Sequence, residues 1–256
     1  MGLSGTDVAR EAADMVLLDD NFASIVTAIE EGRAVFDNIR KFLTYILTHN
    51  VAELMPYLAF ALGPIPLPLT PLQVLSIDMG TDSLTALGLG VEKPDPQVMA
   101  RPPRPHTERL LHWPLVLRAY VFLGLIEAAG ALAGFFFVLS AAGWQPGQSL
   151  APTDPLYRKA TTACLSGIIA LQIVNVFLCR SPSRSVFSTG LGGNRLILWG
   201  VGCEVALLVL IDYTAWGNLL LGTEPLGPDV WWCLLPFAVS MAVLEEGRKW
   251  LVRRVR

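Results

Sequence analysis

Polar side chains interrupt two apolar stretches of the sequence, and these residues are the best suited to chemistry inside a membrane. In the first stretch, Asn50 and Glu53 share one helical face at a spacing of i, i+3, and His49 directly precedes them. A charged residue at membrane depth costs from about 2.5 kcal/mol upward, so such residues usually mark an ion or substrate pathway. We therefore treat this group as one half of a candidate ion site.

The second apolar stretch supplies the other half. Asp78, Thr81 and Asp82 share a helical face at i, i+3 and i+4, with Gly80 between them. A short Pro-rich link connects the two stretches, so they should form neighbouring antiparallel helices with their midpoints at similar depth. Carboxylate, amide and hydroxyl oxygens together suit a hard cation. Gly80 and Pro71 also favour local unwinding, which would free backbone carbonyls for the same ion.

Hydrogen bonding between helices is the alternative role for such groups in a membrane. This alternative stays open for Asn50 and Thr81, because Asn and Thr often bond across helices. It explains the acids less well. Glu53, Asp78 and Asp82 together need a counter-ion if they lie unpaired in a membrane, which favours a cation site.

Later apolar stretches hold further candidates for a cation or proton path, in addition to His49. Gln172 and Asn175 again share a face at i, i+3, and Glu204 lies in the next stretch. Glu127 and Asp212 are weaker candidates. A helix-packing hydrogen bond would explain Glu127, and a position near the outer interface would explain Asp212.

The composition indicates that lipid surrounds these groups. The 256 residues are 53% hydrophobic and only 16% charged, whereas a soluble domain of this size carries roughly 25% charged residues. Six stretches approach or exceed the roughly 20 apolar residues that a spanning helix needs. They are residues 42–62, 69–90, 115–141, 160–179, 196–216 and 230–246. The sequence thus predicts an all-α integral membrane protein with six transmembrane helices.

The placement of Lys and Arg predicts the orientation. With six crossings, 17 of the 19 Lys and Arg residues fall on one side, and only Arg158 and Lys159 fall on the other. Basic loops stay in the cytoplasm, so we expect both termini there, in a plasma (inner) membrane. The four cysteines lie in or beside apolar stretches without CxxC spacing, which disfavours a soft-metal site.

The N-terminal residues differ from the rest. Residues 15–18 (MVLL) are preceded by an acidic stretch and followed by a turn, which predicts the last strand of an α/β domain. From Ala23 a helical pattern continues into the first apolar stretch, and about 40 residues would span about 60 Å. We expect three parts: a domain remnant (1–22), a stalk helix (23–41) and a transmembrane cation-transport domain (42–256).

Ordered motifs along the whole chain resemble type II P-type ATPases. Residues 4–9 (SGTDVA) and 12–22 (AADMVLLDDNF) are similar to the end of their phosphorylation domain, and 30–33 (EEGR) to the stalk of their fifth membrane helix. Residues 50–53 (NVAE) and 77–82 (IDMGTD) resemble the cation-site segments of their fifth and sixth helices. The likeness continues at residues 101–104 (RPPR), 231–233 (WWC) and 246–249 (EGRK).

The resemblance implies that Asn50, Glu53, Asp78, Thr81 and Asp82 are cation ligands. It does not single out Na⁺, K⁺ or Ca²⁺. Asp78, Gln172 and Glu204 resemble the sodium/potassium pump, whereas Asn175 resembles the calcium pump. His49 departs from both, and a titratable group there suggests proton counter-transport.

The same resemblance implies a larger pump. Its phosphorylated Asp lies in a DKTGT motif, and these 256 residues contain no such string. We expect the chain to be a fragment that holds no cofactor and is inactive alone, while ATP and Mg²⁺ act in the full-length pump. Its expected partners are the lipid bilayer and the missing N-terminal part of the pump, with no nucleic acid. The alternative is a stand-alone, non-enzymatic six-helix ion channel or ion-binding protein, which would have no use for the segment at 15–41.

Overall fold

Long apolar runs form long helices, because lipid offers no partner for free backbone groups. The computed structural model describes residues 1–105 and 107–255, and its regular secondary structure there is entirely helical. The elements are α1 (Asp7–Glu11), α2 (Ala23–Leu62), α3 (Pro71–Ser76), η1 (Ile77–Asp82), α4 (Ser83–Gly90), α5 (Trp113–Val116), η2 (Leu117–Leu123), α6 (Gly124–Ala141), α7 (Pro155–Cys179), α8 (Val186–Thr189), α9 (Arg195–Tyr213), α10 (Ala215–Leu221) and α11 (Pro228–Val255). The π-helices η1 and η2 join their neighbours into continuous helices.

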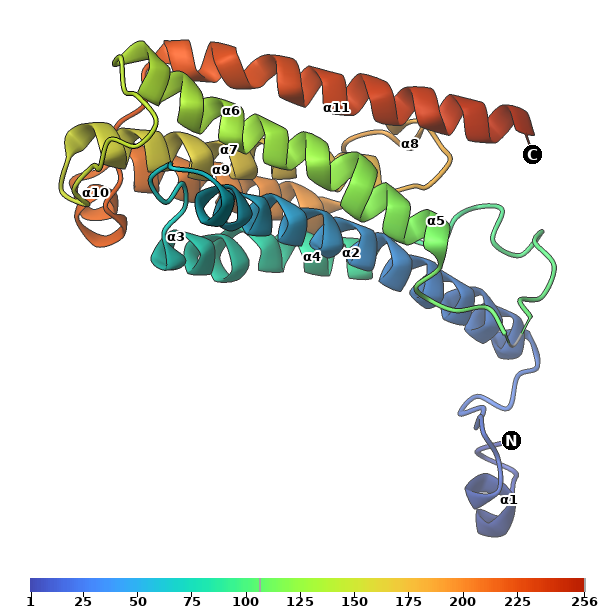
Figure 1. Ribbon diagram of the computed structural model, residues 1–256. Coiled ribbons are helices and arrows are strands. Elements are labelled where there is room, and N and C mark those ends of the chain that lie inside the picture. The colour runs from blue at the N-terminus through green and yellow to red at the C-terminus, as the bar shows by residue number, and fades with distance from the viewer. Residues whose placement is uncertain (106, 256) are drawn as a thin grey trace.

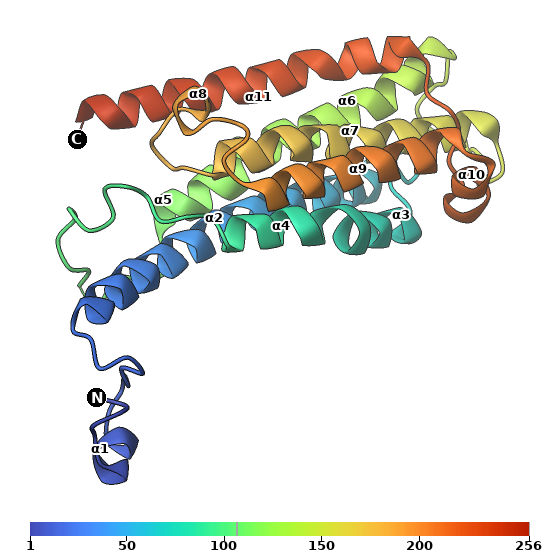
Figure 2. The same ribbon diagram turned by 180° about the vertical axis from the view of Figure 1, so that it is seen from behind.

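Helix α2 is a single 40-residue helix, as the sequence predicts. It runs along the bundle, and the segment that holds α1 extends away from its N-terminal end (Figures 1 and 2). Pro56 lies inside the helix without ending it. The element can therefore connect the N-terminal segment mechanically with the middle of the bundle.

Within the described chain, four helices are long and apolar enough to cross a membrane: Trp113–Ala141, Pro155–Cys179, Arg195–Tyr213 and Pro228–Arg254. They correspond to the last four predicted spans. The predicted end at residue 216 is wrong, because Thr214 leaves the helix and its hydroxyl caps α10 by accepting from the Gly217 N–H at 3.1 Å.

The first two predicted spans form helices, but they fall outside this apolar set. Residues 42–62 are the second half of α2, and the continuous helix from α3 to α4 covers residues 71–90. These two helices carry Asn50, Glu53, Asp78, Thr81 and Asp82, and these polar side chains lower the mean apolarity of both.

The predicted strand at residues 15–18 does not form in the part of the chain that the structure describes. A strand needs a neighbouring strand to pair with its backbone groups, and here the Leu17 carbonyl accepts from the Gly2 N–H at 2.7 Å and, within a local turn, from the Asp20 N–H at 3.4 Å. The Asp20 carboxylate accepts from the backbone N–H groups of Leu3 and Ser4 and from the Ser4 hydroxyl, which holds residues 3 and 4 against this segment.

Helix α7 lies at the centre of the bundle. It packs against α2, α4, α6, α9 and α11, and most of its side chains are buried. On one side of it, α4 packs closely against α9. Gly200 permits this approach, because a Cβ there would lie 2.6 Å from Thr85 Cγ2. The close approach sets the spacing of polar groups carried by these two helices.

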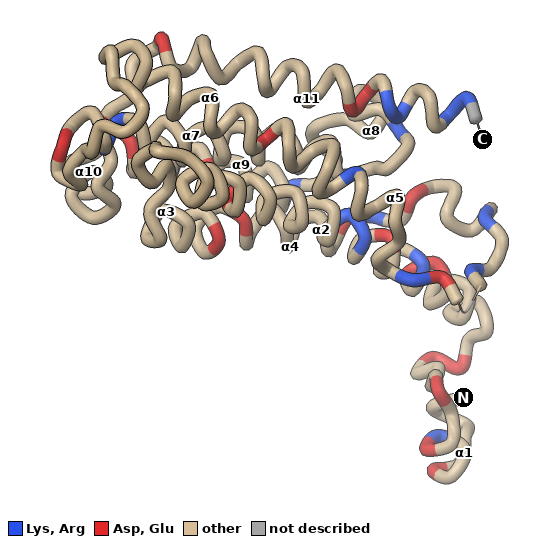
Figure 3. Tube along the Cα trace, in the orientation of Figure 1, with Lys and Arg blue, Asp and Glu red and all other residues tan. Residues whose placement is uncertain are grey.

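The charged residues divide the bundle into two unlike ends. Figure 3 shows Lys and Arg gathered at the end where the C-terminus of α11 and the start of α5 lie. The opposite end carries Arg158 and Lys159 near the start of α7. The polar candidate residues lie between these ends, within the helices.

Candidate cation site

The first polar contact of the site joins η1 to α7. The Gln172 side-chain amide donates to Asp82 Oδ1 and, at 3.2 Å, to Thr81 Oγ1. All three side chains are buried, Gln172 completely. An amide of α7 thereby orients a carboxylate and a hydroxyl of η1, and it brings together three residues that the sequence singled out.

A π-helix presents these groups. Residues 77–82 of η1 form i→i+5 turns in place of α-helical ones, and such turns are frequent at functional sites. Thr81 Oγ1 donates to the Ile77 carbonyl at 3.0 Å, and Ser83 Oγ donates to the Asp78 carbonyl at 3.1 Å. The segment is therefore a widened helical turn and is not unwound. Its Ile77 and Asp78 carbonyls already accept hydrogen bonds from side-chain hydroxyls.

The widened turn also divides residues that were expected to share one face. Thr81 and Asp82 are buried, whereas Asp78 is exposed. The reason is that π-helical turns change the angular spacing on which the i, i+3, i+4 pattern depends. Asn50 of α2 is likewise exposed, while Glu53 is buried. The candidate ligands therefore comprise a buried set and an exposed set.

Glu53 offers oxygens that the bundle does not use. Its side chain is 9% exposed, and within the described chain its Oε1 atom has no hydrogen-bond partner. Pro56 adds a second oxygen nearby, because proline has no N–H and the carbonyl of Ala52, four residues earlier, loses its usual helical partner. A buried carboxylate beside a freed carbonyl is a suitable pair of ligands for a hard cation.

Glu204 is the centre of a second polar contact, which joins α9 to α4 and α2. Its Oε1 accepts from the Thr85 hydroxyl at 2.7 Å and from the Tyr45 hydroxyl at 3.4 Å, and the two hydroxyls lie 2.9 Å apart. All three side chains are fully buried, and Glu204 Oε2 is unbonded among the described residues. The carboxylate therefore keeps one oxygen for a ligand.

The sequence reasoning missed Tyr45 and Thr85. A signal was present, because each lies four residues, about one helical turn, from a residue that was selected: Tyr45 from His49 and Thr85 from Thr81. Hydroxyls on the same helical face as candidate ligands are thus candidates themselves.

His49 pairs with Glu127 of α6. Its Nδ1 atom lies 2.5 Å from Glu127 Oε1, and the two side chains are 1% and 0% exposed. The imidazole also packs edge-on against the Tyr45 ring, with centroids 4.2 Å apart. Among the described residues, His49 Nε2 and Glu127 Oε2 have no partner. The pair anchors α2 to α6 beside the candidate site.

The remaining candidates lie in two separate places. Asn175 is fully buried in α7, where its Oδ1 accepts from Cys179 Sγ at 3.4 Å and its Nδ2 is unpartnered within the described chain. Asp212 of α9 accepts from the Ser166 hydroxyl at 2.7 Å. It is buried and lies one residue before the end of α9.

The oxygens of the site are mixed in kind. Among the residues that the structure describes, no three His, Cys, Asp or Glu side chains form a group able to hold a metal ion by themselves. A cation here would combine carboxylates with amide, hydroxyl and carbonyl oxygens, as hard cations do in proteins.

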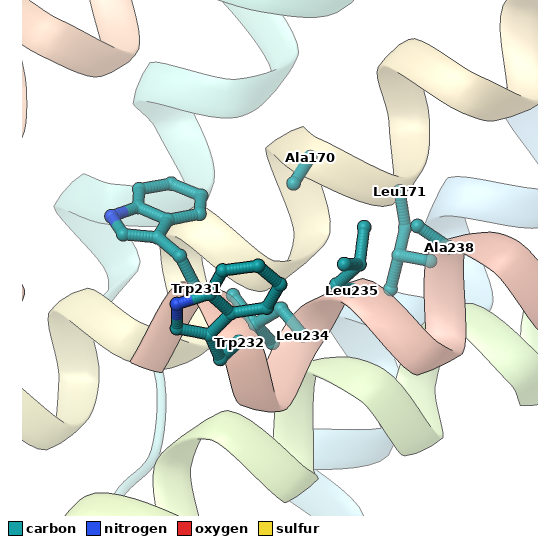
Figure 4. A pocket seen from close by; sticks show the side chains of 7 residues that line it. All are labelled: Ala170, Leu171, Trp231, Trp232, Leu234, Leu235 and Ala238. Atoms are coloured by element: carbon teal, nitrogen blue, oxygen red, sulfur yellow. The ribbon is translucent and has the colours of Figure 1, made fainter. Parts of the chain in front are cut away.

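A separate apolar groove lies on α11 and α7, away from these groups. Trp231, Trp232 and Leu235 of α11 line it together with Ala170 and Leu171 of α7 (Figure 4). Its volume is about 320 Å³, and its lining side chains carry no charge. It offers no ligand for a cation and is not part of the site.

The chain is similar to known proteins over most of its length. A family model described as "Cation transporting ATPase, C-terminus" matches residues 66–251. The chain is 36% identical to the sodium/potassium-transporting ATPase subunit alpha-3 of Rattus norvegicus, over 99% of the chain and 27% of that protein. It is 34% identical to the alpha subunit of Tetronarce californica, with the same coverage.

The match extends over almost the whole chain, whereas the chain spans only about a quarter of the length of these relatives. The matched region includes the π-helix η1, the core helix α7 and the Glu204 contact. The chain belongs to the family of P-type cation-transporting ATPases and is similar to their C-terminal membrane part.

Proposed function

We propose that this chain is the part of an ATP-driven P-type pump that binds a hard cation and carries it across the membrane. One observation carries the proposal. Buried carboxylate oxygens of α2 and α9, at Glu53 and Glu204, have acceptor capacity that the described residues leave unused. Leaving such groups unbonded costs about 1–3 kcal/mol each, and a cation would recover that cost.

The membrane arrangement is part of the proposal. Residues 42–62 of α2 and the helix from Pro71 to Gly90 would be two further spans beside the four apolar helices. Their polar residues would face the ion path and not the lipid. The basic end of the bundle would then lie in the cytoplasm with both termini, and the membrane would be the plasma (inner) membrane.

The ligands would be Asn50, Glu53, Asp78, Thr81 and Asp82. Gln172, Asn175 and Glu204 would extend the path into the bundle. In this arrangement the exposed side chains of Asn50 and Asp78 would face the part of the pump that completes the site. His49 would be held beside the path by Glu127 through its Nδ1, and its Nε2, unpartnered within the described chain, would remain available to a proton.

Na⁺ and K⁺ are the proposed cations. The matched relatives are named sodium/potassium-transporting, and amide and hydroxyl groups beside a few carboxylates suit ions of low charge. ATP and Mg²⁺ would act in other parts of the pump, because the helices described here supply the transport path and not a nucleotide site.

Ion binding to a P-type pump that carries this sequence as its membrane part, in lipid nanodiscs, tests the proposal. We expect saturable binding of labelled Na⁺ or of Rb⁺ as a K⁺ analogue, and Asp82→Asn should weaken it at least tenfold, or about 1.4 kcal/mol. Asp229→Asn is the matched control, because Asp229 is exposed at the far end of the bundle. Equal affinity in both variants, or saturable binding of Ca²⁺ alone, would show that the site or its ion is misassigned.

A further inference from the structure

A second cavity lies at the basic end of the bundle, apart from the cation site. Its volume is about 570 Å³, within the range of small-molecule sites. The first half of α2, the loop after α4, the start of α5 and η2, the loop between α7 and α9, and the end of α11 all contribute to its wall. Five segments distant in sequence thus enclose one space.

The wall of this cavity is strongly cationic. Eight Lys and Arg side chains line it, against three Asp and Glu. The strongest pairs are Arg180 with Glu92 at 2.7 Å and Arg101 with Asp37 at 2.8 Å. A more distant pair joins Arg184 to Asp95 at 3.8 Å. These contacts neutralise three of the eight positive charges.

Two further carboxylates contact the lining arginines from outside the wall. Arg40 pairs with Glu108 at 2.7 Å. Arg118 and Arg248 share Glu245, at 2.6 and 2.7 Å, so one negative charge serves two guanidinium groups. With all five acids counted, three positive charges of the wall remain unbalanced, and Lys41 and Lys93 are the two lining cations without an acid partner within the described chain.

Several donors of the wall are also unused. Lys41 Nζ donates to Asn38 Oδ1 at 2.8 Å and, within the described residues, lies in contact with no carboxylate. The buried Nε atoms of Arg40 and Arg118 have no partner there either. Burial lowers the pKa of Lys41, and the more distant Glu92, Asp37 and Asp95 oppose this shift only in part. The unbonded donors and the excess of positive charge therefore suit an anion.

We propose that this cavity binds a phosphate monoester. A phosphate supplies three strong acceptor oxygens and nearly two negative charges, which match three unbalanced cations and the unused Nζ and Nε donors. Basic pockets between helices at the cytoplasmic face bind anionic lipid head groups, and the cavity lies at the basic end of the bundle. The ligand is either such a head group or a soluble phosphate, and both present the same chemistry.

Thermal unfolding of the detergent-solubilised chain, followed by tryptophan fluorescence, tests the proposal. The probes are inorganic phosphate and dihexanoyl phosphatidate, with sodium chloride of equal ionic strength as reference. Ligand binding to the folded state raises Tm in a saturable way. Tm should rise with both probes and not with chloride. At least tenfold tighter binding of phosphatidate identifies a lipid source, and equal affinity identifies a soluble one.

Substitutions in the cavity wall test whether the Tm response to phosphate arises from binding in this cavity. Lys41→Gln and Arg184→Gln should each weaken the Tm response at least tenfold in apparent affinity. Arg184 is 43% exposed, so its variant keeps the test valid if Lys41→Gln does not fold. Lys159→Gln, at the opposite end of the bundle, should respond like the wild type. The absence of any phosphate response, or an unchanged response in the Lys41 and Arg184 variants, would overturn the proposal.

Discussion

The Thr85 hydroxyl of α4 donates to Glu204 Oε1 of α9 at 2.7 Å, although 119 residues separate the two in sequence. The contact depends on a glycine one turn before Glu204. A Cβ on Gly200 would lie 2.6 Å from Thr85 Cγ2 and 3.0 Å from the Thr85 backbone nitrogen. Backbone spacing between α4 and α9 therefore sets the geometry of a candidate ligand.

Gly200→Ala should consequently destabilise the bundle. The added methyl group must push α9 away from α4, and overpacking of this kind costs about 1–3 kcal/mol. The free energy of unfolding in mixed detergent measures the effect. Gly202→Ala is the matched control on the same helix, because nothing lies within 4 Å of its Cβ position. Equal stability of the two variants would show that the close approach is unimportant.

The His49–Glu127 pair should behave as a coupled unit. Removal of one partner leaves the other buried without its charge or hydrogen-bond partner, which costs about 3–5 kcal/mol for a buried ion pair. The double variant His49→Leu/Glu127→Leu removes both polar groups, so it should lose much less than the sum of the single variants. A double-mutant cycle on the free energy of unfolding measures this coupling. Additive losses would mean that the two side chains do not stabilise each other.

Glu92 should give the basic end of the bundle an acid-sensitive contribution to stability. Burial alone would raise the pKa of the Glu92 carboxyl, but hydrogen bonds from Arg180 and Asn194 outweigh burial and lower this pKa from its ordinary value of 4.5. A depressed carboxyl pKa stabilises the fold above the unfolded-state value, and this contribution is lost as pH falls through the folded-state pKa.

The stability difference between the wild type and Glu92→Gln should therefore be largest at neutral pH and shrink below about pH 4.5. Unfolding free energies measured across that range provide the check. Glu108→Gln is a useful comparison, since Glu108 pairs with a different arginine, Arg40. A difference that stays constant from neutral to acidic pH would rule out the linkage.

Much of the fold could be predicted from the sequence because single helices depend on local pattern. The length of α2 follows from its unbroken periodicity, and four apolar spans follow from their composition. The strand at 15–18 could not be predicted correctly, because a strand depends on partners elsewhere. The end of the fifth span was misplaced since the hydroxyl of Thr214 caps a new helix there.

The candidate residues could be selected from the sequence, but their arrangement could not. Spacing within one helix selected Thr81 and Asp82, and both are buried beside Gln172. The same spacing failed for Asp78, because η1 is a π-helix and not an α-helix. Pairing across helices lies beyond local pattern, which is why Glu127 was not recognised as the partner of His49, 78 residues away.

We propose that the acids of α2 and η1 bind the transported cation, and cation-stimulated phosphorylation measures that role. The measurement uses a P-type pump that carries this sequence as its membrane part, with Glu53→Gln, Asp78→Asn and Asp82→Asn made singly and Asp229→Asn as control. Each of the three should need at least tenfold more cation for half-maximal phosphorylation, about 1.4 kcal/mol, while the control keeps the wild-type requirement. Wild-type cation dependence in all three variants would contradict the assignment of these acids as cation ligands.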